Sequence, residues 1–258
     1  MDLGLHGKAA IVGGASMGIG YGIARELARE GCRVAITARR EAGLVKAAEL
    51  LRAETGAEIL PVQADSRRAE DCQRAVETVV TAFGGIDVLV NNDGAPPLGE
   101  LATFDDVAWA KAVEQNLLYV VRMARAVVPS MVARGGGSVL NIAALSAIQP
   151  MATFGLSVAT WGGVLGYAKT LSLEVARHNI NVNTICPGYI ETQRLEKVFS
   201  TGGDPEGMRA GLAAEIPMGR IGTVEDISAL VALLVSPRGR YVTGTAIQVD
   251  GGLLRGVR

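Results

Sequence analysis

The sequence has few cysteines and no strong excess of either charge. Its three cysteines, Cys32, Cys72 and Cys186, are odd in number, far apart and without a C-x-x-C pair. This pattern argues against a disulfide framework and against a zinc site, and it fits a reducing compartment such as the cytoplasm. The 25 basic and 26 acidic residues leave a formal net charge of -1, so no global field attracts nucleic acid or an anionic membrane.

Targeting segments, long apolar stretches and repeats are also missing. The N-terminal region runs from a polar start into a short apolar stretch, without the charged-then-apolar pattern of a signal segment. We see no apolar stretch long enough to span a bilayer, no internal repeat and no Pro/Ser-rich linker. We therefore expect the 258 residues to form one cytoplasmic domain of the α/β size class that binds neither nucleic acid nor membrane.

Short apolar runs alternate with longer helical patterns along the whole chain. Strands are predicted near Ala9–Val12, Val34–Thr37, Ile59–Val62, Val88–Asn91, Ser138–Ile142, Asn181–Ile185 and Ala246–Val249. Helices are predicted at roughly Ile19–Glu30, Ala42–Glu54, Ala69–Phe83, Phe104–Ala133, Val158–His178 and Val224–Leu234. This alternation is typical of βαβ units around a parallel sheet that is buried on both faces.

Two helix starts and one irregular segment complete this outline. Thr103 lies three residues before Asp106, and Thr223 lies three residues before Asp226, so a reciprocal capping interaction is predicted at both places. Residues 187–222 carry turn-forming residues and no clear periodicity. We interpret this segment as a lid over a site rather than as a domain boundary.

A glycine-rich segment follows the first predicted strand and opens the first predicted helix. It contains Gly14, Ser16, Met17, Gly18, Ile19 and Gly20. Glycines at a sharp strand-to-helix turn allow a pyrophosphate to approach the free N–H groups of the helix. An ordinary glycine-rich turn could have the same residues. The position of this turn, between a strand and a helix in a chain of alternating strands and helices, favours a dinucleotide-binding loop.

The end of the second predicted strand indicates which dinucleotide is bound. Arg39 and Arg40 stand where proteins that prefer NAD place an acidic residue for the ribose hydroxyls. An arginine can instead pair with the 2′-phosphate of NADP. We expect NADP rather than NAD, the alternative being that both arginines are merely solvated at the start of a helix.

Five elements have a characteristic spacing. They are Gly14-x-x-x-Gly18-Ile19-Gly20, Asp65 after the third strand, Asn91-Asn92-Asp93-Gly94 after the fourth, Asn116 within a helix and Pro187-Gly188 after the sixth. Together they resemble the short-chain dehydrogenase/reductase family, and residues 217–252 are similar to its 3-oxoacyl-carrier-protein reductase branch. The resemblance implies a Rossmann-type three-layer α/β/α sandwich with a seven-stranded parallel sheet, assembled as a dimer or tetramer.

The resemblance also implies where the cofactor lies. Asp65 and Ser66 would face the adenine, although Ser66 could instead cap the following helix. Asn91 and Gly94 would line the ribose region, and Ile190 with Thr192 would hold the carboxamide end, next to Pro187 and Gly188. One departure is Asp93, where the family usually has alanine. Its carboxylate would repel cofactor phosphates if it faced them, but a solvent-facing turn residue that bonds its own backbone is favoured.

The groups with which the family transfers a proton are replaced in this chain. Family members use a serine after the fifth strand and, on the next helix, a tyrosine and a lysine four residues apart. The matching positions hold Ala144, Ser157 and Trp161. Serine is a far weaker acid than tyrosine and tryptophan carries no charge, so these replacements predict loss of the family's proton-transfer route.

The remaining candidates for catalysis are Ser157, Ser146 and Asn116. Ser146 is the hydroxyl nearest to Ala144, and Asn116 serves a proton relay in the family, although here it could make only a polar contact within the helices. Trp161 could obstruct the nicotinamide half of the cofactor, stack on a flat ligand or pack in the core. Gly162, Gly163 and Gly166 favour close approach of another subunit, the arrangement usual in the family, or of a large ligand.

Apolar residues surround the expected site. They are Pro96, Pro97, Leu98, Pro150, Met151, Phe154, Leu195, Val198, Phe199 and Met208. They favour a small, uncharged and fairly apolar substrate, unless they only pack the lid.

Three functions are consistent with these features. The first is an NADP(H)-dependent oxidoreductase for a carbonyl or alcohol, with the proton supplied by Ser157, Ser146 or water. The second is an inactive cofactor-binding or assembly subunit, either in a homo-oligomer or beside an active homologue. The third is a non-redox lyase, hydratase or dehalogenase, which ranks last because relatives that abandon redox chemistry usually lose the glycine-rich loop.

Overall fold

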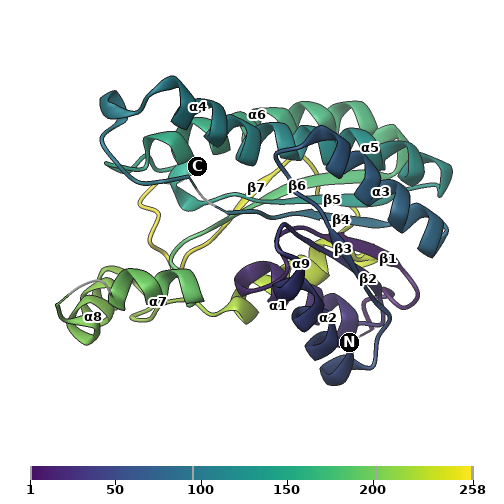
Figure 1. Cartoon of the computed structure of the whole chain (residues 1–258), viewed down its shortest axis with the longest axis horizontal. Helices are drawn as coiled ribbons and strands as arrows, with labels where there is room; N and C mark the ends of the chain where they lie inside the picture. Colours follow the sequence, from purple (N-terminus) through teal and green to yellow (C-terminus); the bar gives the residue numbers. More distant parts are fainter. Residues whose placement is uncertain (1, 95, 201–202, 257–258) are drawn as a thin grey trace.

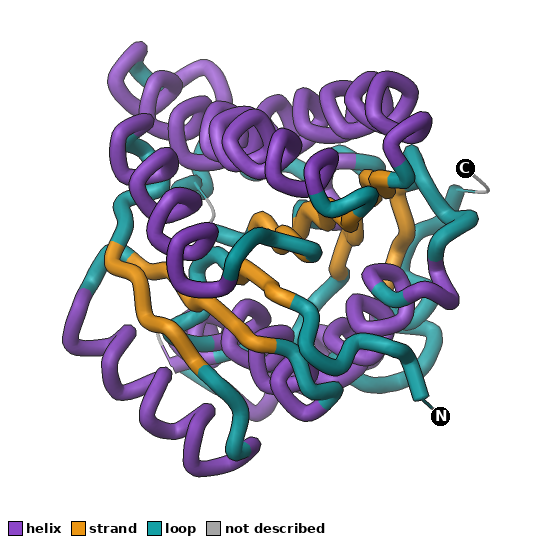
Figure 2. The backbone as a smooth tube through the Cα atoms, turned by 90° about the vertical axis from the view of Figure 1, so that its right-hand side faces the viewer, coloured by secondary structure: helices purple, strands orange, loops and turns teal. Residues whose placement is uncertain are grey.

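Seven parallel strands form one sheet at the centre of the molecule (Figures 1 and 2). The computed structural model describes residues 2–94, 96–200 and 203–256. The strands are β1 (Ala9–Val12), β2 (Arg33–Ala38), β3 (Ile59–Gln63), β4 (Val88–Asn91), β5 (Gly137–Ile142), β6 (Ile180–Pro187) and β7 (Ala246–Val249). They lie in the order β3-β2-β1-β4-β5-β6-β7, which confirms the parallel sheet predicted from the alternating pattern.

Helices cover both faces of the sheet (Figure 1). One layer contains α3 (Ala69–Phe83), α5 (Tyr119–Ala133) and α6 (Gly155–Val175), and the other contains α1 (Gly18–Arg29), α2 (Glu41–Thr55) and α9 (Val224–Val235). Alternate residues of β1 enter opposite cores: Ala9 and Ile11 join the cluster under α3, α5 and α6, whereas Ala10 and Val12 join the cluster under α1, α2 and α9. The predicted three-layer sandwich is therefore confirmed.

The helical run before β5 lies within the predicted range Phe104–Ala133, but it is more apolar than we expected. It comprises α4 (Asp106–Ala112), a π-helical segment η2 (Val113–Leu118) and α5. By length and composition alone this run could cross a membrane, which corrects the expectation that no such stretch exists. Its apolar side chains Val120, Met123, Val127 and Met131 are buried in the core under the sheet, so one side of the run packs within the chain.

The two predicted helix caps had different outcomes. At α9 the Thr223 Oγ1 accepts the Asp226 N–H at 3.3 Å, and the Asp226 carboxylate accepts the Thr223 N–H at 2.7 Å, so this capping box is confirmed. The prediction at Thr103 is wrong. α4 begins later, and Asp105 caps it by accepting the Ala108 N–H at 2.8 Å. Thr103 lies in a short 3-10 turn, where its hydroxyl donates to the Glu100 carbonyl.

Residues 187–200 and 203–222 contain more helix than the sequence indicated. They contain α7 (Gln193–Ser200) and α8 (Pro205–Glu215), which extend beside the two helical layers (Figure 1). The Asp204 carboxylate caps α8 by accepting the Gly207 N–H at 2.9 Å, and proline is favourable at the first helical position. In a sequence an Asp-Pro pair is typical of a loop, but it is equally typical of a helix start.

The glycines of α6 differ in their surroundings. A Cβ added to Gly163 would lie 3.2 Å from the side chain of Leu117, so packing within the chain explains this glycine. A Cβ added to Gly162 or Gly166 would meet no described atom within 4 Å. The predicted approach of another subunit therefore concerns Gly162 and Gly166.

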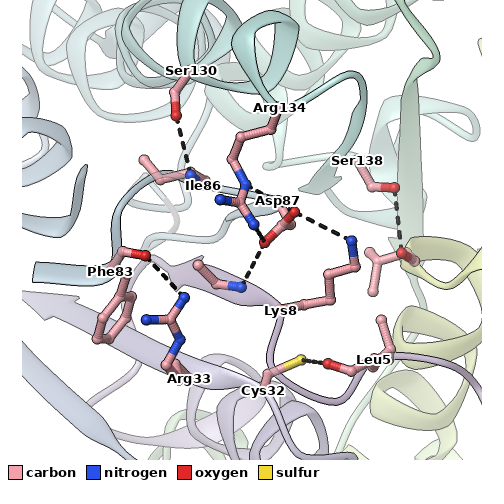
Figure 3. A network of polar contacts seen from close by, with 12 residues as sticks. Leu5, Lys8, Cys32, Arg33, Phe83, Ile86, Asp87, Ser130, Arg134 and Ser138 are labelled. Carbon is pink, nitrogen blue, oxygen red and sulfur yellow. Dashed lines mark hydrogen bonds and ion pairs between the residues drawn. The ribbon is translucent and has the colours of Figure 1, made fainter.

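A polar network ties the amino ends of the central strands together (Figure 3). Asp87, directly before β4, accepts hydrogen bonds from Arg134 Nε at 3.1 Å, Arg134 Nη2 at 2.9 Å and the Ala9 N–H at 2.8 Å. Lys8 Nζ lies 3.4 Å from the same carboxylate. One carboxylate thus joins β1, β4 and the end of α5 at the edge of the sheet opposite to the strand carboxyl ends.

Candidate functional site

A hollow of about 400 Å³ lies where β1, β2, β3 and β4 end. In open α/β sheets, ligands bind at the carboxyl ends of the strands. The predicted cofactor residues that line the hollow are Gly14, Ser16, Met17, Gly18, Ile19, Arg39, Arg40, Asp65, Ser66, Gly94 and Thr192. Segments after β1, β2, β3, β4 and β6 therefore meet around one cavity, as the spacing of the motifs indicated.

The glycine-rich turn has the geometry of a phosphate-binding loop. Gly14 and Gly18 adopt φ values of 55° and 61°, a backbone region that disfavours side chains. A Cβ added to Gly14 would lie 2.7 Å from the Asn92 carbonyl oxygen, so the loop packs closely against the segment after β4. α1 begins at Gly18 without a side-chain cap. The N–H groups of its first turn are therefore available to an anion that enters the hollow.

The opposite side of the hollow is basic. Arg39 and Arg40 are exposed, and neither guanidinium makes an ion pair or a hydrogen bond with a described residue. Both are therefore free to bind a phosphate. Asp65, in contrast, already has a partner, since its carboxylate accepts the side-chain and backbone N–H groups of Arg67. These hydrogen bonds lower the pKa of Asp65 against the effect of partial burial.

Ser66 and Asp93 form a contact that the sequence did not predict. The Ser66 hydroxyl donates to Oδ2 of Asp93 rather than capping α3, which starts at Ala69 after Arg68. Asp93 also accepts the N–H of Gly94 at 2.6 Å, so the expected bond to its own backbone is present. Its carboxylate, however, is half-buried and lines the hollow, which corrects the expectation that it faces solvent.

Five of the predicted cofactor residues do not line this hollow. Gly20 lies inside α1, where a Cβ would lie 2.5 Å from the Gly14 carbonyl. Asn91 is buried and donates to Asn141 Oδ1 at 2.9 Å. Pro187 is buried at the end of β6, Gly188 packs against Asp250, and Ile190 is 6% exposed. These residues support the walls of the site. Of the predicted residues after β6, Thr192 alone lines the hollow.

Several lining residues were not predicted. They are Thr37, Ala38, Ala64, Arg67, Asn92, Gln115, Tyr119, Gln193 and Arg194. Gln115 and Tyr119 are four residues apart and flank Asn116 in the helix, so helical spacing could have placed them on one face. Tyr119 is buried, and burial raises the pKa of its phenol well above the ordinary value.

Of the three positions that we matched to the family's proton-transfer groups, Ser157 and Trp161 are buried and Ala144 is half-buried. Trp161 is 5% exposed and belongs to the core cluster that also contacts Ala143 and Ala144. It therefore packs in the core in this structure. Ser146 and Ser157 are 2% and 3% exposed, and Ser146 Oγ has no hydrogen-bond partner among the described residues.

Asn116 lies in the π-helical segment η2 and is fully buried. Its Nδ2 donates to Thr160 Oγ1 at 3.0 Å, and Thr160 Oγ1 donates in turn to the Leu156 carbonyl. The Asn116 Oδ1 has no partner among the described residues. Asn116 thus joins η2 to α6, one residue before Trp161, and it retains one free acceptor at that point.

The apolar residues expected around the site fall into two groups. Phe199 is buried with Ile216 and Ile221, and Leu195 packs against them, so these side chains form the core of the α7–α8 segment. Leu98, Val198 and Met208 are exposed.

A second hollow of about 240 Å³ lies after β5 and β6 and is lined by Leu145, Gln149, Met151, Tyr189, Glu215, Leu253 and Arg255. Its lining mixes apolar and charged groups.

Comparison with known proteins agrees with the fold and with the family resemblance. The family model described as enoyl-(acyl carrier protein) reductase matches residues 14–254. A 3-oxoacyl-[acyl-carrier-protein] reductase of Vibrio cholerae is 32% identical over 97% of this chain and 99% of its own length. The human dehydrogenase/reductase SDR family member 4 is 34% identical over 96% of this chain and 88% of its own length.

A solved structure is also similar over the full length. L-sorbose reductase from Gluconobacter frateurii, complexed with NADPH and L-sorbose, is 36% identical, covers 100% of both chains and superposes with a TM-score of 0.97. The matched family model, the relatives and this structure confirm the family resemblance that the five spaced motifs indicated. The chain belongs to the short-chain dehydrogenase/reductase family of oxidoreductases.

Proposed function

We propose that the protein binds NADP(H) in the hollow beside β1–β4 and interconverts a carbonyl and an alcohol without the family's tyrosine and lysine. The observation that carries this proposal is the intact hollow, in which the glycine-rich turn, two free arginines and Thr192 surround one cavity. When bound, the dinucleotide would supply or accept a hydride. The NADPH complex of the similar L-sorbose reductase supports the choice of ligand.

The preference for NADP over NAD rests on Arg39 and Arg40. Both lie at the mouth of the hollow after β2, and neither has a partner among the described residues. A guanidinium pairs with phosphate through two parallel hydrogen bonds. These two residues would hold the 2′-phosphate, while the first turn of α1 would hold the pyrophosphate.

Water is the proton donor that the structure favours. Ser146 and Ser157 are 2% and 3% exposed, so neither hydroxyl is open to a substrate in this conformation. Trp161 supplies no proton and no charge. A water molecule in the second hollow, polarised by Gln149 or Arg255, would deliver the proton to the substrate oxygen.

The second hollow is the proposed substrate site. It follows β5 and β6, next to Ala144 and to the Pro187-Gly188 turn. Leu145, Met151 and Leu253 suit the apolar part of a small, uncharged substrate, whereas Gln149 and Arg255 suit its oxygen atoms. The α7–α8 segment would serve as the lid over this site.

Location and assembly belong to the same proposal. The three cysteines are free and buried in the described structure, which supports a reducing cytoplasm. The open faces of Gly162 and Gly166 support a homo-oligomer that packs through α6.

Cofactor titration tests the function directly. We expect NADPH to bind more tightly than NADH, and the Arg39→Ala, Arg40→Ala double variant to lose roughly ten- to a hundred-fold in NADPH affinity, because hydrogen bonds to a charged phosphate are removed. Affinity for NADH should change little. Arg68→Ala, which removes an exposed arginine outside the hollow, is the matched control. Failure of the unmodified protein to bind NADPH at millimolar concentration would refute the proposal.

An inactive cofactor-binding subunit is the second candidate. The residues Ala144, Ser157 and Trp161 favour it, since they offer no acid of the strength the family uses. NADPH binding without turnover of any carbonyl in a broad panel, together with copurification of an active homologue, would favour this candidate. Turnover by the isolated protein would exclude it.

A further inference from the structure

Asp93 is a carboxylate inside the hollow that is proposed to receive a polyanion. It follows β4 and contacts two neighbours: Oδ2 accepts the Ser66 hydroxyl, and Oδ1 accepts the Gly94 N–H at 2.6 Å. Both contacts hold the carboxylate in place at the wall of the cavity. The side chain is half-buried before any ligand enters.

Charged and titratable groups face Asp93 from several elements. Arg39 faces Asp93 from the end of β2, and Asp65 and Arg67 face it from the segment after β3. Cys72 of α3 and Tyr119 of α5 also interact with it electrostatically. Arg67 is already paired with Asp65. The positive charge near Asp93 is therefore partly neutralised, and Asp93 has no ion-pair partner of its own among the described residues.

We propose that Asp93 takes up a proton when a dinucleotide binds in the cofactor hollow. This inference rests on the proposed function. A bound dinucleotide brings negatively charged phosphates into the hollow and displaces water from the carboxylate. Both effects disfavour the ionised form, so protonation removes a like-charge repulsion and a desolvation penalty together.

The pKa of Asp93 is already raised in the protein without a bound dinucleotide. Burial raises the pKa of Asp93, and the charge of Asp65 acts in the same direction, whereas the Ser66 and Gly94 hydrogen bonds and the charge of Arg39 lower it. A ligand that raises this pKa further binds more tightly at low pH. Affinity should fall as the pH rises through the range between the free and bound pKa values, and then become constant.

The hydrogen bond from Ser66 provides an independent test of Asp93 protonation. Its hydroxyl donates to the carboxylate, and a hydrogen bond to the charged form favours that form. Removing this donor should shift the pH dependence of binding to higher pH. A residue with only a structural role would not move the pH profile in this direction.

Calorimetric titration measures the proton directly. NAD⁺ and NADP⁺ are titrated between pH 5 and 8 in two buffers of different ionisation enthalpy, and NAD⁺ is the main probe because it lacks the titrating 2′-phosphate. We expect uptake of up to one proton by the unmodified protein and none by Asp93→Asn. At neutral pH, Asp93→Asn should bind on the order of ten-fold more tightly, because one like charge is removed from a partly buried site.

Two further variants complete the test. Ser66→Ala should retain proton uptake but shift it to higher pH. Glu41→Gln removes an exposed carboxylate beside Arg40, outside the hollow, and should leave proton uptake unchanged. Dinucleotide binding with equal proton uptake by Asp93→Asn and the unmodified protein would overturn this inference alone. No binding of either dinucleotide by the unmodified protein would overturn the proposed function and this inference together.

Discussion

Replacing Asp87 with alanine is expected to lower the free energy of unfolding by about 3 kcal/mol, because it breaks a buried charge network and leaves a buried N–H without an acceptor. The Asp87 side chain is 8% exposed and accepts from Arg134 and from the Ala9 N–H (Figure 3). Urea unfolding at pH 7, followed by circular dichroism, measures the difference. Arg134 is about a third exposed and can regain water, which keeps the loss below that of a fully buried pair.

The pH dependence of this loss has a defined sign. Burial alone would raise the pKa of Asp87, but the hydrogen bonds from Arg134 and Ala9, with the charge of Lys8, lower it below the ordinary value of 3.8. A depressed folded pKa stabilises the protein above the unfolded pKa, and this contribution is lost as the pH falls through the folded value. The difference between the unmodified protein and Asp87→Ala should therefore be constant from pH 5 to 7 and shrink below about pH 4.

Lys8→Ala is the matched control for charge. Its ammonium lies 3.4 Å from the carboxylate and is 43% exposed, so we expect a loss of less than about 1 kcal/mol. An equal loss in Lys8→Ala and Asp87→Ala would show that general surface charge, rather than the Arg134 and Ala9 hydrogen bonds, stabilises this edge.

The sequence allowed the sheet to be predicted because its strands are buried on both faces. Such strands appear as short, continuous apolar runs, and each is separated from the next by a helix or turn signal. β1, β4 and β7 begin and end where they were predicted. α7 and α8 are short and mostly exposed, so their apolar patterns are brief and were missed. The spacing of Leu195, Val198 and Phe199 was the signal that could have marked α7.

The cofactor loop was predictable for a different reason. Gly14 and Gly18 have positive φ values, which glycine adopts more readily than other residues, so the glycine pattern in the sequence indicates this turn. Contacts between distant segments, in contrast, leave no local signal. The Ser66–Asp93 hydrogen bond joins residues 27 positions apart, and the pairing of Asp65 with Arg67 depends on side-chain rotamers. Arg67 is distant in the sequence from Gln115 and Tyr119, and only the fold brings the three residues to one hollow.

Restoring the family's proton-transfer set is expected to have the largest effect on activity. The variant that combines Ala144→Ser, Ser157→Tyr and Trp161→Lys should raise kcat/KM for NADPH-dependent carbonyl reduction by about 10²- to 10⁴-fold, the range that a positioned general acid contributes. Positions 157 and 161 are one helical turn apart and therefore share a face of α6. Asn116 donates to Thr160, the residue before position 161, and its Oδ1 lacks a partner among the described residues.

A phenylalanine at position 157 provides the matched control. The variant with Ala144→Ser, Ser157→Phe and Trp161→Lys has nearly the same volume and charge but no phenol, so it should show none of the gain in kcat. Trp161 fills core space, and both variants therefore need a thermal unfolding measurement to show that they are folded. Similar rates for the tyrosine and phenylalanine variants would contradict the prediction.

The single variant Trp161→Lys separates cofactor geometry from proton transfer. An ammonium at this position can contact the nicotinamide ribose, as in the family, but it cannot replace the missing phenol. If the indole obstructs the nicotinamide half, this change alone should tighten NADPH binding while kcat stays low. If NADPH affinity is unchanged and only the triple variant gains activity, Trp161 is a core residue, and the chain has lost its acid but kept its cofactor site. Turnover by the unmodified chain at the rate of the triple variant would instead show that water, or another group of this protein, already supplies the proton efficiently.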